Sequence, residues 1–252
     1  MTYEQAVSWW CYDDKGIDDH DRIATIKRIG YTGVEILPVD KFQMVRDAGL
    51  KITAHGLHSP LEVGLNDPKN WESIRRQADE TLLLATKYEI PHLIVFSGNR
   101  DGIDDETGKE SCIKHLEMLA KDAESANVTL ILELLNSRVD HPDYQCDHTA
   151  WGVDVVSAVD SPNVRLLYDI YHMQIMEGNI IQTIRDYHQW FAHYHTAGVP
   201  GRNEIDATQE LNYRAICQTI QATGYTGYLV QEFFPVHDWR ASLEQAYDVC
   251  DI

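Results

Sequence analysis

The chain has 252 residues, 44% of them hydrophobic, so it is long enough to bury a complete core as one domain. Its net charge of −19, from 21 Lys and Arg against 40 Asp and Glu, argues against nucleic acid as a partner, because phosphate binding requires clustered basic side chains. No stretch approaches the roughly 20 apolar residues that cross a bilayer, and the N-terminal segment MTYEQAVSWW lacks the basic and apolar regions of a signal peptide.

Apolar, strand-like runs recur along the chain about one βα unit apart. They cover residues 6–11, 33–37, 51–56, 92–97, 129–135, 164–170, 191–197 and 228–234. Segments with helical periodicity lie at 19–29, 70–88, 109–126, 212–223 and 239–249, and the stretch 98–108 is predicted as a long loop. Near-continuous apolar strands that alternate with helices indicate a parallel sheet whose outer face is covered by helices. The sequence therefore predicts an α/β fold, a single (β/α)8 TIM barrel domain spanning residues 1–252.

One candidate metal ligand lies near the end of each of the last four runs: Glu133, Asp169, His195 and Glu232. A carboxylate inside an apolar run is costly to bury unless a partner compensates its charge. In such barrels the chemistry lies at the C-terminal ends of the strands, which are about 4.8 Å apart, so four consecutive ends can surround one ion. Singly, each residue has an ordinary explanation, such as an ion pair, a helix cap or a hydrogen-bonded core histidine. Together, at equivalent positions, they favour a shared divalent cation.

These four residues offer three carboxylates and one imidazole. Oxygen ligands suit Mg²⁺ or Mn²⁺, and the nitrogen also accommodates Co²⁺, whereas a structural zinc site is disfavoured because no thiolate is present. Such a cation can bind adjacent carbonyl and hydroxyl oxygens of a substrate and acidify the neighbouring C–H. We therefore expect a cation-dependent site for a small hydroxy-carbonyl compound.

Polar side chains beyond the strand-like runs are candidates for contacting the substrate. Arg202 lies in the Gly- and Pro-rich segment GVPGR, and its guanidinium suits a carboxylate or a hydroxylated substrate. His172 lies just after the sixth run, Asn99 after the fourth and His58 after the third. Structural hydrogen bonding is an equal alternative for His58, and a surface ion pair is the alternative for Arg202.

Three motifs reveal a family resemblance: DIYHMQIMEGN at 169–179, GVPGRNE at 198–204 and ELNY at 210–213. Together with LELLN around Glu133 and QEF around Glu232, they closely resemble the hydroxypyruvate isomerase family of the xylose isomerase-like barrel superfamily. The resemblance covers most of the chain from the fourth run onward. The N-terminal third is similar mainly in its barrel layout.

This resemblance implies an aldose–ketose type isomerisation, with hydroxypyruvate converted to tartronate semialdehyde. It assigns Glu133 and Glu232 as the acid and the base, which transfer a proton through a cis-enediolate while lying against the metal. Asp169 matches a further metal ligand in the family. His172 and Arg202 match residues that contact the substrate in the superfamily.

One position departs from the family pattern. Hydroxypyruvate isomerases carry Gln at the fourth ligand position, where this chain has His195, and the related ketose 3-epimerases use Glu, Asp, His and Glu. The choice between isomerase and epimerase is therefore open. Further alternatives are a sugar dehydratase or lyase, an apurinic-site endonuclease, which the acidic charge disfavours, and a non-catalytic carbohydrate-binding barrel.

The expected partner is a small sugar or keto acid, with neither a nucleic acid nor a membrane, and association between copies of the chain is left open. The five cysteines are widely spaced and include no CxxC pair, which disfavours a disulfide framework. This cysteine usage fits a reducing cytoplasm, so we predict a cytoplasmic protein.

Overall fold

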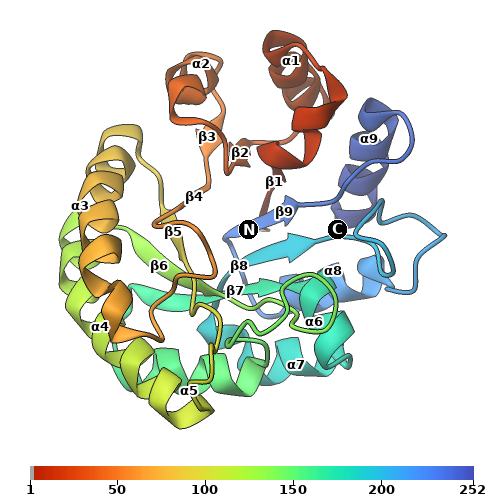
Figure 1. Ribbon diagram of the computed structural model, residues 1–252. Coiled ribbons are helices and arrows are strands. Elements are labelled where there is room, and N and C mark those ends of the chain that lie inside the picture. The colour runs from red at the N-terminus through yellow and green to blue at the C-terminus, as the bar shows by residue number, and fades with distance from the viewer. Residues whose placement is uncertain (1–2) are drawn as a thin grey trace.

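The computed structural model describes residues 3–252, in which parallel strands form a barrel surrounded by helices (Figure 1). The strands are β1 (Glu4–Ser8), β2 (Gly33–Glu35), β3 (Lys51–Ile52), β4 (Ala54–Gly56), β5 (His92–Val95), β6 (Thr129–Glu133), β7 (Val164–Asp169), β8 (Phe191–Thr196) and β9 (Tyr228–Gln231). Their order in the sheet is β3-β2-β1-β9-β8-β7-β6-β5-β4.

The barrel closes through β3 and β4, which are separated only by Thr53. The N–H of Thr53 donates to the carbonyl of Val34 (2.9 Å), and the N–H of Ile36 donates to the carbonyl of Ala54 (3.3 Å). Both bonds join this stretch to β2, so β3 and β4 act as one interrupted strand of an eight-membered barrel. The predicted (β/α)8 fold is confirmed.

Helices cover the outside of the strands (Figure 1). They are α1 (Asp19–Ile29), α2 (Phe42–Asp47), α3 (Trp71–Tyr88), α4 (Asp105–Ala126), α5 (Thr149–Val159), α6 (Ile170–Met176), α7 (Ile180–Tyr187), α8 (Tyr213–Ala222) and α9 (Trp239–Cys250), with short 3-10 helices η1 (Trp9–Lys15), η2 (Val39–Lys41), η3 (Pro68–Asn70) and η4 (His188–Trp190). The five predicted helical segments correspond to α1, α3, α4, α8 and α9. Within residues 3–252, no helix combines the length and the apolar character that crossing a membrane would require.

The first strand was predicted at 6–11, and that prediction is wrong at its end. The strand β1 stops at Ser8, and the chain continues as η1. The buried guanidinium of Arg22 accounts for the turn, because it donates to the carbonyls of Trp9 and Tyr12, both at 3.1 Å. These carbonyls therefore find their partner in α1 and not in a neighbouring strand.

The long loop predicted at 98–108 is shorter than expected, because α4 already begins at Asp105. The carboxylate of Asp104 accepts hydrogen bonds from the N–H groups of Glu106 (3.1 Å) and Thr107 (3.0 Å). Such a cap satisfies donors that the first helical turn leaves free.

Strand side chains alternate between the barrel interior and the helix-covered outer face. A small apolar cluster fills part of the interior and is distinct from the larger core: Ala54, Ile94, Ile131 and Leu167. Glu133 and Asp169 each follow a member of this cluster by two residues, so both face the interior nearer the C-terminal end of the barrel. Backbone alternation thus brings polar side chains together above an apolar floor.

Candidate metal centre and active site

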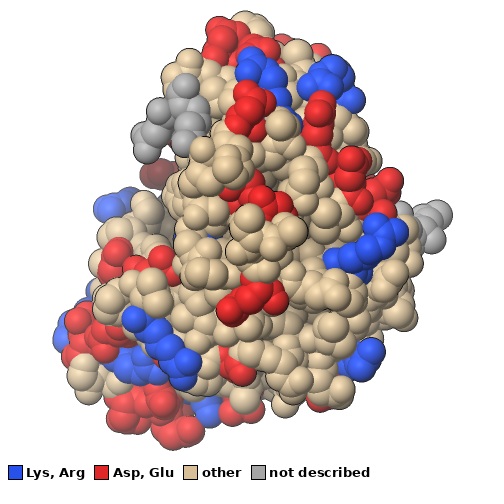
Figure 2. Space-filling model, turned by 90° about the vertical axis from the view of Figure 1, so that its right-hand side faces the viewer, with Lys and Arg blue, Asp and Glu red and all other residues tan. Residues whose placement is uncertain are grey.

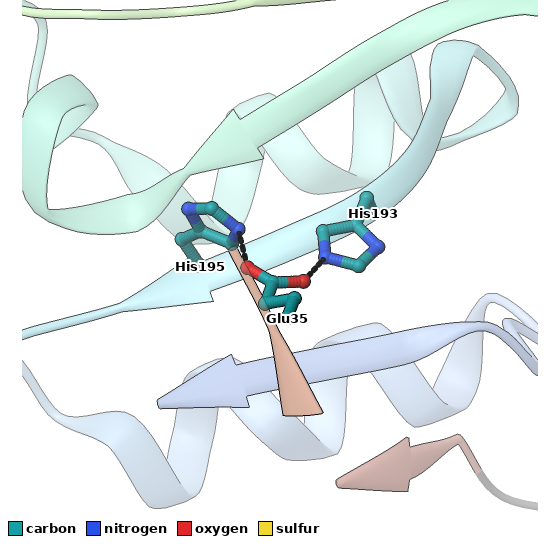
Figure 3. Close-up of side chains that lie close together, drawn as sticks. All are labelled: Glu35, His193 and His195. Carbon is teal, nitrogen blue, oxygen red and sulfur yellow. Dashed lines mark hydrogen bonds and ion pairs between the residues drawn. The ribbon is translucent and has the colours of Figure 1, made fainter. Parts of the chain in front are cut away.

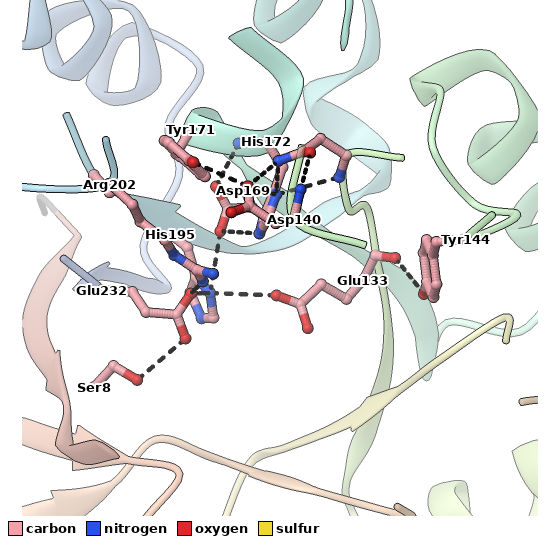
Figure 4. A network of polar contacts seen from close by, with 12 residues as sticks. Ser8, Glu133, Asp140, Tyr144, Asp169, Tyr171, His172, His195, Arg202 and Glu232 are labelled. Atoms are coloured by element: carbon pink, nitrogen blue, oxygen red, sulfur yellow. Dashed lines mark hydrogen bonds and ion pairs between the residues drawn. The ribbon is translucent and has the colours of Figure 1, made fainter. Parts of the chain in front are cut away.

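The four predicted ligands meet at the C-terminal end of the barrel (Figure 4). Glu133 and Asp169 end β6 and β7, His195 lies near the end of β8, and Glu232 directly follows β9. One ligand atom from each residue lies within 4.8 Å of all the others, and all four residues are buried. Nδ1 of His195 is 3.1 Å from Glu232 Oε2, 3.5 Å from Glu133 Oε1 and 3.7 Å from Asp169 Oδ2.

Burial and the charges of neighbouring side chains shift the pKa values of this cluster. Burial raises the pKa of Glu133, and it raises the pKa of Asp169 to about 7. Burial alone would lower the pKa of His195, but the carboxylates of Glu232 and Glu35 outweigh it and raise that pKa well above its usual value. Each of these three shifts favours the protonated form of its group. Three buried carboxylates and one imidazole fit a hard divalent cation, which would replace those protons.

The two glutamates have different surroundings. Although burial opposes ionisation, His195 and Arg202 hold the pKa of Glu232 well below its ordinary value. Its Oε1 accepts from the indole N–H of Trp10 (2.9 Å) and the hydroxyl of Ser8 (3.3 Å), and its Oε2 accepts from Arg202 (2.6 Å). Among the described residues, the Glu133 carboxylate has only the longer contact with His195 given above. Glu232 is thus fixed and ionised, while Glu133 is less tightly held and more readily protonated.

Arg202 lies in the loop after β8, with its guanidinium in the site. The guanidinium carbon is 5.3 Å from the ring centroid of Trp10, 5.5 Å from that of Tyr171 and 5.9 Å from that of Phe234. These aromatic faces attract the positively charged guanidinium of Arg202 and confine it beside Glu232. The Nε of Arg202 is buried and makes no hydrogen bond to another described residue. It is therefore a free donor at the site.

Gly198 fixes the loop that carries Arg202, and its replacement by alanine is expected to move that loop. A Cβ at this position would lie 2.3 Å from the carbonyl oxygen of Glu204. Because that neighbour is backbone, the strain cannot be relieved by a rotamer change, and we expect a loss of about 1–3 kcal/mol of stability. Urea unfolding and steady-state kinetics would measure this loss together with a rise in KM.

The matched control is Gly102→Ala. Gly102 also lies on a loop, with φ +84°, but a Cβ there meets nothing within 4 Å. It should lose some stability through backbone strain and leave KM unchanged. An unchanged KM in Gly198→Ala would contradict the placement of Arg202 at the substrate.

The predicted substrate-binding residue His172 lies beside the ligands and is completely buried. Its Nδ1 lies 3.2 Å from the backbone N and 2.6 Å from Nδ2 of Asn136, so it accepts hydrogen bonds and the ring proton belongs on Nε2. That nitrogen is 3.7 Å from Asp169 Oδ2, and the Asp169 carboxylate also accepts from the N–H of His172 (3.0 Å). His172 thus orients a candidate metal ligand.

The other two predicted substrate contacts, His58 and Asn99, make their described contacts with residues other than the four ligands. His58 accepts a hydrogen bond from the N–H of Phe96 (3.1 Å) and lines a cavity of about 380 Å³ that also includes His55 and Ile94. Asn99 is bound mainly through its backbone, while its buried side-chain oxygen has no hydrogen-bond partner in the described chain. The described contacts join neither residue to the four ligands.

Two residues that support the centre, Glu35 and Tyr144, were not predicted from the sequence. Glu35 ends β2 and contacts His195 from the opposite direction to the other carboxylates. Tyr144 donates from its hydroxyl to the carbonyl of Glu133 (2.9 Å), which fixes the end of β6 (Figure 4). A signal for Glu35 was present, because it is a carboxylate inside the apolar run 33–37, the same feature that singled out Glu133.

A closed parallel barrel with a buried cluster of three carboxylates and one histidine at its C-terminal end defines the class of protein. Residues 23–249 match the family model described as Xylose isomerase-like TIM barrel, so the chain belongs to that family.

Individual relatives share between a quarter and a third of their residues with this chain. A putative hydroxypyruvate isomerase of Mus musculus is 26% identical over 254 residues, covering 94% of this chain and 91% of the relative. A 2-oxo-tetronate isomerase of Pectobacterium atrosepticum is 28% identical over 227 residues, covering 85% and 86%.

Solved structures share the whole architecture. A structure described as AP endonuclease, family 2, from Brucella melitensis superposes with a TM-score of 0.85 at 25% identity, covering 96% of both chains. D-psicose 3-epimerase from Clostridium cellulolyticum H10 superposes with a TM-score of 0.77 at 20% identity, covering 99% of this chain and 100% of the other. At this identity, the second comparison shows a shared fold.

Proposed function

We propose that this protein is a cation-dependent isomerase of a small keto acid, with hydroxypyruvate, converted to tartronate semialdehyde, as the first substrate to test. The observation that carries the proposal is the placement of Glu133 and Glu232. In Figure 4 they face each other across the site, with His195 beside Glu232 and Asp169 drawn above them. A substrate carbon between the two carboxylates has a proton acceptor on one side and a proton donor on the other.

In the proposed reaction, one glutamate removes a proton from the hydroxyl-bearing carbon and leaves an enediolate of the substrate. The other glutamate delivers a proton to the neighbouring carbon, which had been the carbonyl carbon, and a hydroxyl proton passes between the two oxygens. Each such step by a positioned group contributes about 10²- to 10⁴-fold to the rate. The bound cation would supply positive charge for the two substrate oxygens. Arg202 and the Nε2–H of His172 are the donors available to orient the substrate.

The preference for a keto acid rests on the relatives and on Arg202. The mouse and bacterial relatives are named for isomerases of hydroxypyruvate and 2-oxo-tetronate, both of which carry a carboxylate. A hydrogen bond from arginine to a carboxylate is worth about 1.5–3 kcal/mol, which corresponds to roughly 10- to 100-fold in affinity. The buried Nε of Arg202, which has no hydrogen-bond partner among residues 3–252, supports this assignment.

A ketose 3-epimerase is the second candidate, favoured by His195 as the nitrogen ligand among three carboxylates. Isomerisation and epimerisation begin with the same proton removal and differ in where the proton returns. An endonuclease acting on abasic DNA is disfavoured by the net charge of −19. On the face drawn in Figure 2, Lys and Arg are dispersed among Asp and Glu and form no continuous basic surface.

Substrate turnover tests these alternatives. The purified chain, treated with EDTA and reloaded with Mn²⁺, would be assayed with hydroxypyruvate, 2-oxo-tetronate, fructose, tagatose and psicose. We expect kcat/KM for a keto acid to exceed that for any ketose by at least about tenfold, because Arg202 binds a charged carboxylate more strongly than it binds a neutral sugar hydroxyl. Interconversion of fructose and psicose alone would establish the epimerase. Binding of sugars without turnover of any compound would establish a carbohydrate-binding barrel.

A further inference from the structure

Glu35 lies inside the barrel between two histidines of β8 (Figure 3). Its Oε1 is 2.7 Å from Nε2 of His195, and its Oε2 is 2.8 Å from Nε2 of His193. All three side chains are completely buried. Neither Oε1 of Glu35 nor Nε2 of His195 has a hydrogen bond to any other residue of the described chain. Their 2.7 Å ion-pair contact with each other is therefore the close polar contact that the described residues offer to both atoms.

The contact distinguishes the two nitrogens of His195. Nε2 points at Glu35, while Nδ1 points at Glu133, Asp169 and Glu232. A neutral imidazole carries one N–H, and a carboxylate holds that proton on the nitrogen it faces. With the proton on Nε2, the lone pair of Nδ1 is directed at the candidate cation site. Contacts of this kind fix the tautomer and the ring orientation of metal-binding histidines.

The backbone beside Glu35 is strained, and polar side chains surround its carboxylate. The next residue, Ile36, has φ +48°, a left-handed conformation that is strongly disfavoured for a β-branched side chain. Such strain persists only where the surroundings enforce it. The hydroxyl of Thr53 donates to Glu35 Oε2 (3.1 Å), and Nδ1 of His193 lies 3.0 Å from Nδ1 of His92. An apolar residue would fill the same space without a buried charge, so packing alone does not account for a carboxylate here.

We propose that Glu35 is a positioning residue, which holds His195 in the orientation and tautomer that bind the cation and so sets the affinity of the centre. This inference rests on the cation site of the proposed function. It assigns Glu35 no contact with the substrate. His193 and Thr53 contribute by holding the carboxylate.

The test is the affinity of the complete, metal-free protein for Mn²⁺, measured by titration calorimetry and by electron paramagnetic resonance. Glu35→Gln should bind Mn²⁺ about 10- to 100-fold more weakly than the unaltered chain, as is usual when such a partner is removed. Asp147→Asn is the matched control. Asp147 is also a buried carboxylate, bonded to Ser137 and Arg100, but it contacts none of the four ligands. It should lose stability and keep its Mn²⁺ affinity.

A second measurement needs no variant and covers the case in which Glu35→Gln does not fold. Nitrogen-15 NMR of the Mg²⁺-bound protein, with the His195 signals assigned from their absence in His195→Gln, should show the proton on Nε2. A proton on Nδ1, or equal Mn²⁺ affinity in a folded Glu35→Gln variant, would overturn the inference. If the unaltered chain does not bind Mn²⁺ or Mg²⁺, the cation site of the proposed function fails instead, so the two failures are distinguishable.

Discussion

Replacing Glu133 or Glu232 with glutamine is expected to lower kcat by about 10²- to 10⁴-fold, because each substitution removes one proton-transfer group and leaves the shape of the site intact. The measurement is steady-state turnover of hydroxypyruvate at saturating Mn²⁺. Saturation separates the loss of proton transfer from a loss of cation affinity. The double variant should lose little beyond the worse single variant, since both residues serve one reaction.

The two variants should differ in stability when no cation is present. Glu133→Gln removes a carboxylate whose ionised form burial already disfavours, so the metal-free protein should be equally or more stable at pH 8. Glu232→Gln leaves the guanidinium of Arg202 buried without its charged partner, and breaking such a pair costs about 3–5 kcal/mol. Turnover undiminished in both folded variants would rule out the two-glutamate mechanism.

The stabilisation of the protein by Mn²⁺ or Mg²⁺ is expected to increase with pH between 5.5 and 8.5. Protons compete with the cation for two ligands: Asp169, whose pKa burial raises to about 7, and His195, whose pKa the carboxylates raise despite its burial. In the metal-free protein a raised Asp169 pKa makes folding less favourable as pH rises from about 4 to about 7. The stability that protonated His195 contributes is fully present below its ordinary pKa of 6.5 and is lost as pH rises through the higher folded value. Both effects lower the free energy of unfolding of the metal-free protein at high pH. A bound cation restores the positive charge that the lost protons had supplied.

Thermal unfolding in EDTA and in Mn²⁺ at four pH values would measure this. At a cation concentration of about 100 times Kd the stabilisation is about 2.7 kcal/mol. Glu35 does not contribute to the change, because the two neighbouring histidines, acting against its burial, lower its pKa to about 2. A stabilisation that stays constant or decreases with rising pH would contradict the proposed ligand set. We also expect EDTA to abolish turnover and Mn²⁺ or Co²⁺ to restore it.

Several elements could not be predicted, for identifiable reasons. The helices α2, α6 and α7 have only 6, 7 and 8 residues, too few for a periodic pattern to stand out. In α5 five of the eleven residues are buried, and the strongly apolar sequence leaves little contrast between its faces. The end of β1 depends on Arg22, which lies 13 residues from Trp9 and whose burial no local pattern reveals.

By itself, the sequence determined the barrel and the four residues at its mouth. Apolar runs and the burial cost of a carboxylate are local properties, so Glu133, Asp169 and Glu232 could be recognised without coordinates. His195 could be recognised by its equivalent position near the end of a run. The orientation of His195 depends on Glu35, 160 residues earlier in the chain, and the ionisation of Glu232 depends on Trp10 and Arg202. Only the closure of the barrel brings these groups within hydrogen-bonding distance. The interaction between neighbouring charges decides which nitrogen and which carboxylate carries a proton. Its energy decreases with the distance between the charges, and only the tertiary structure sets that distance.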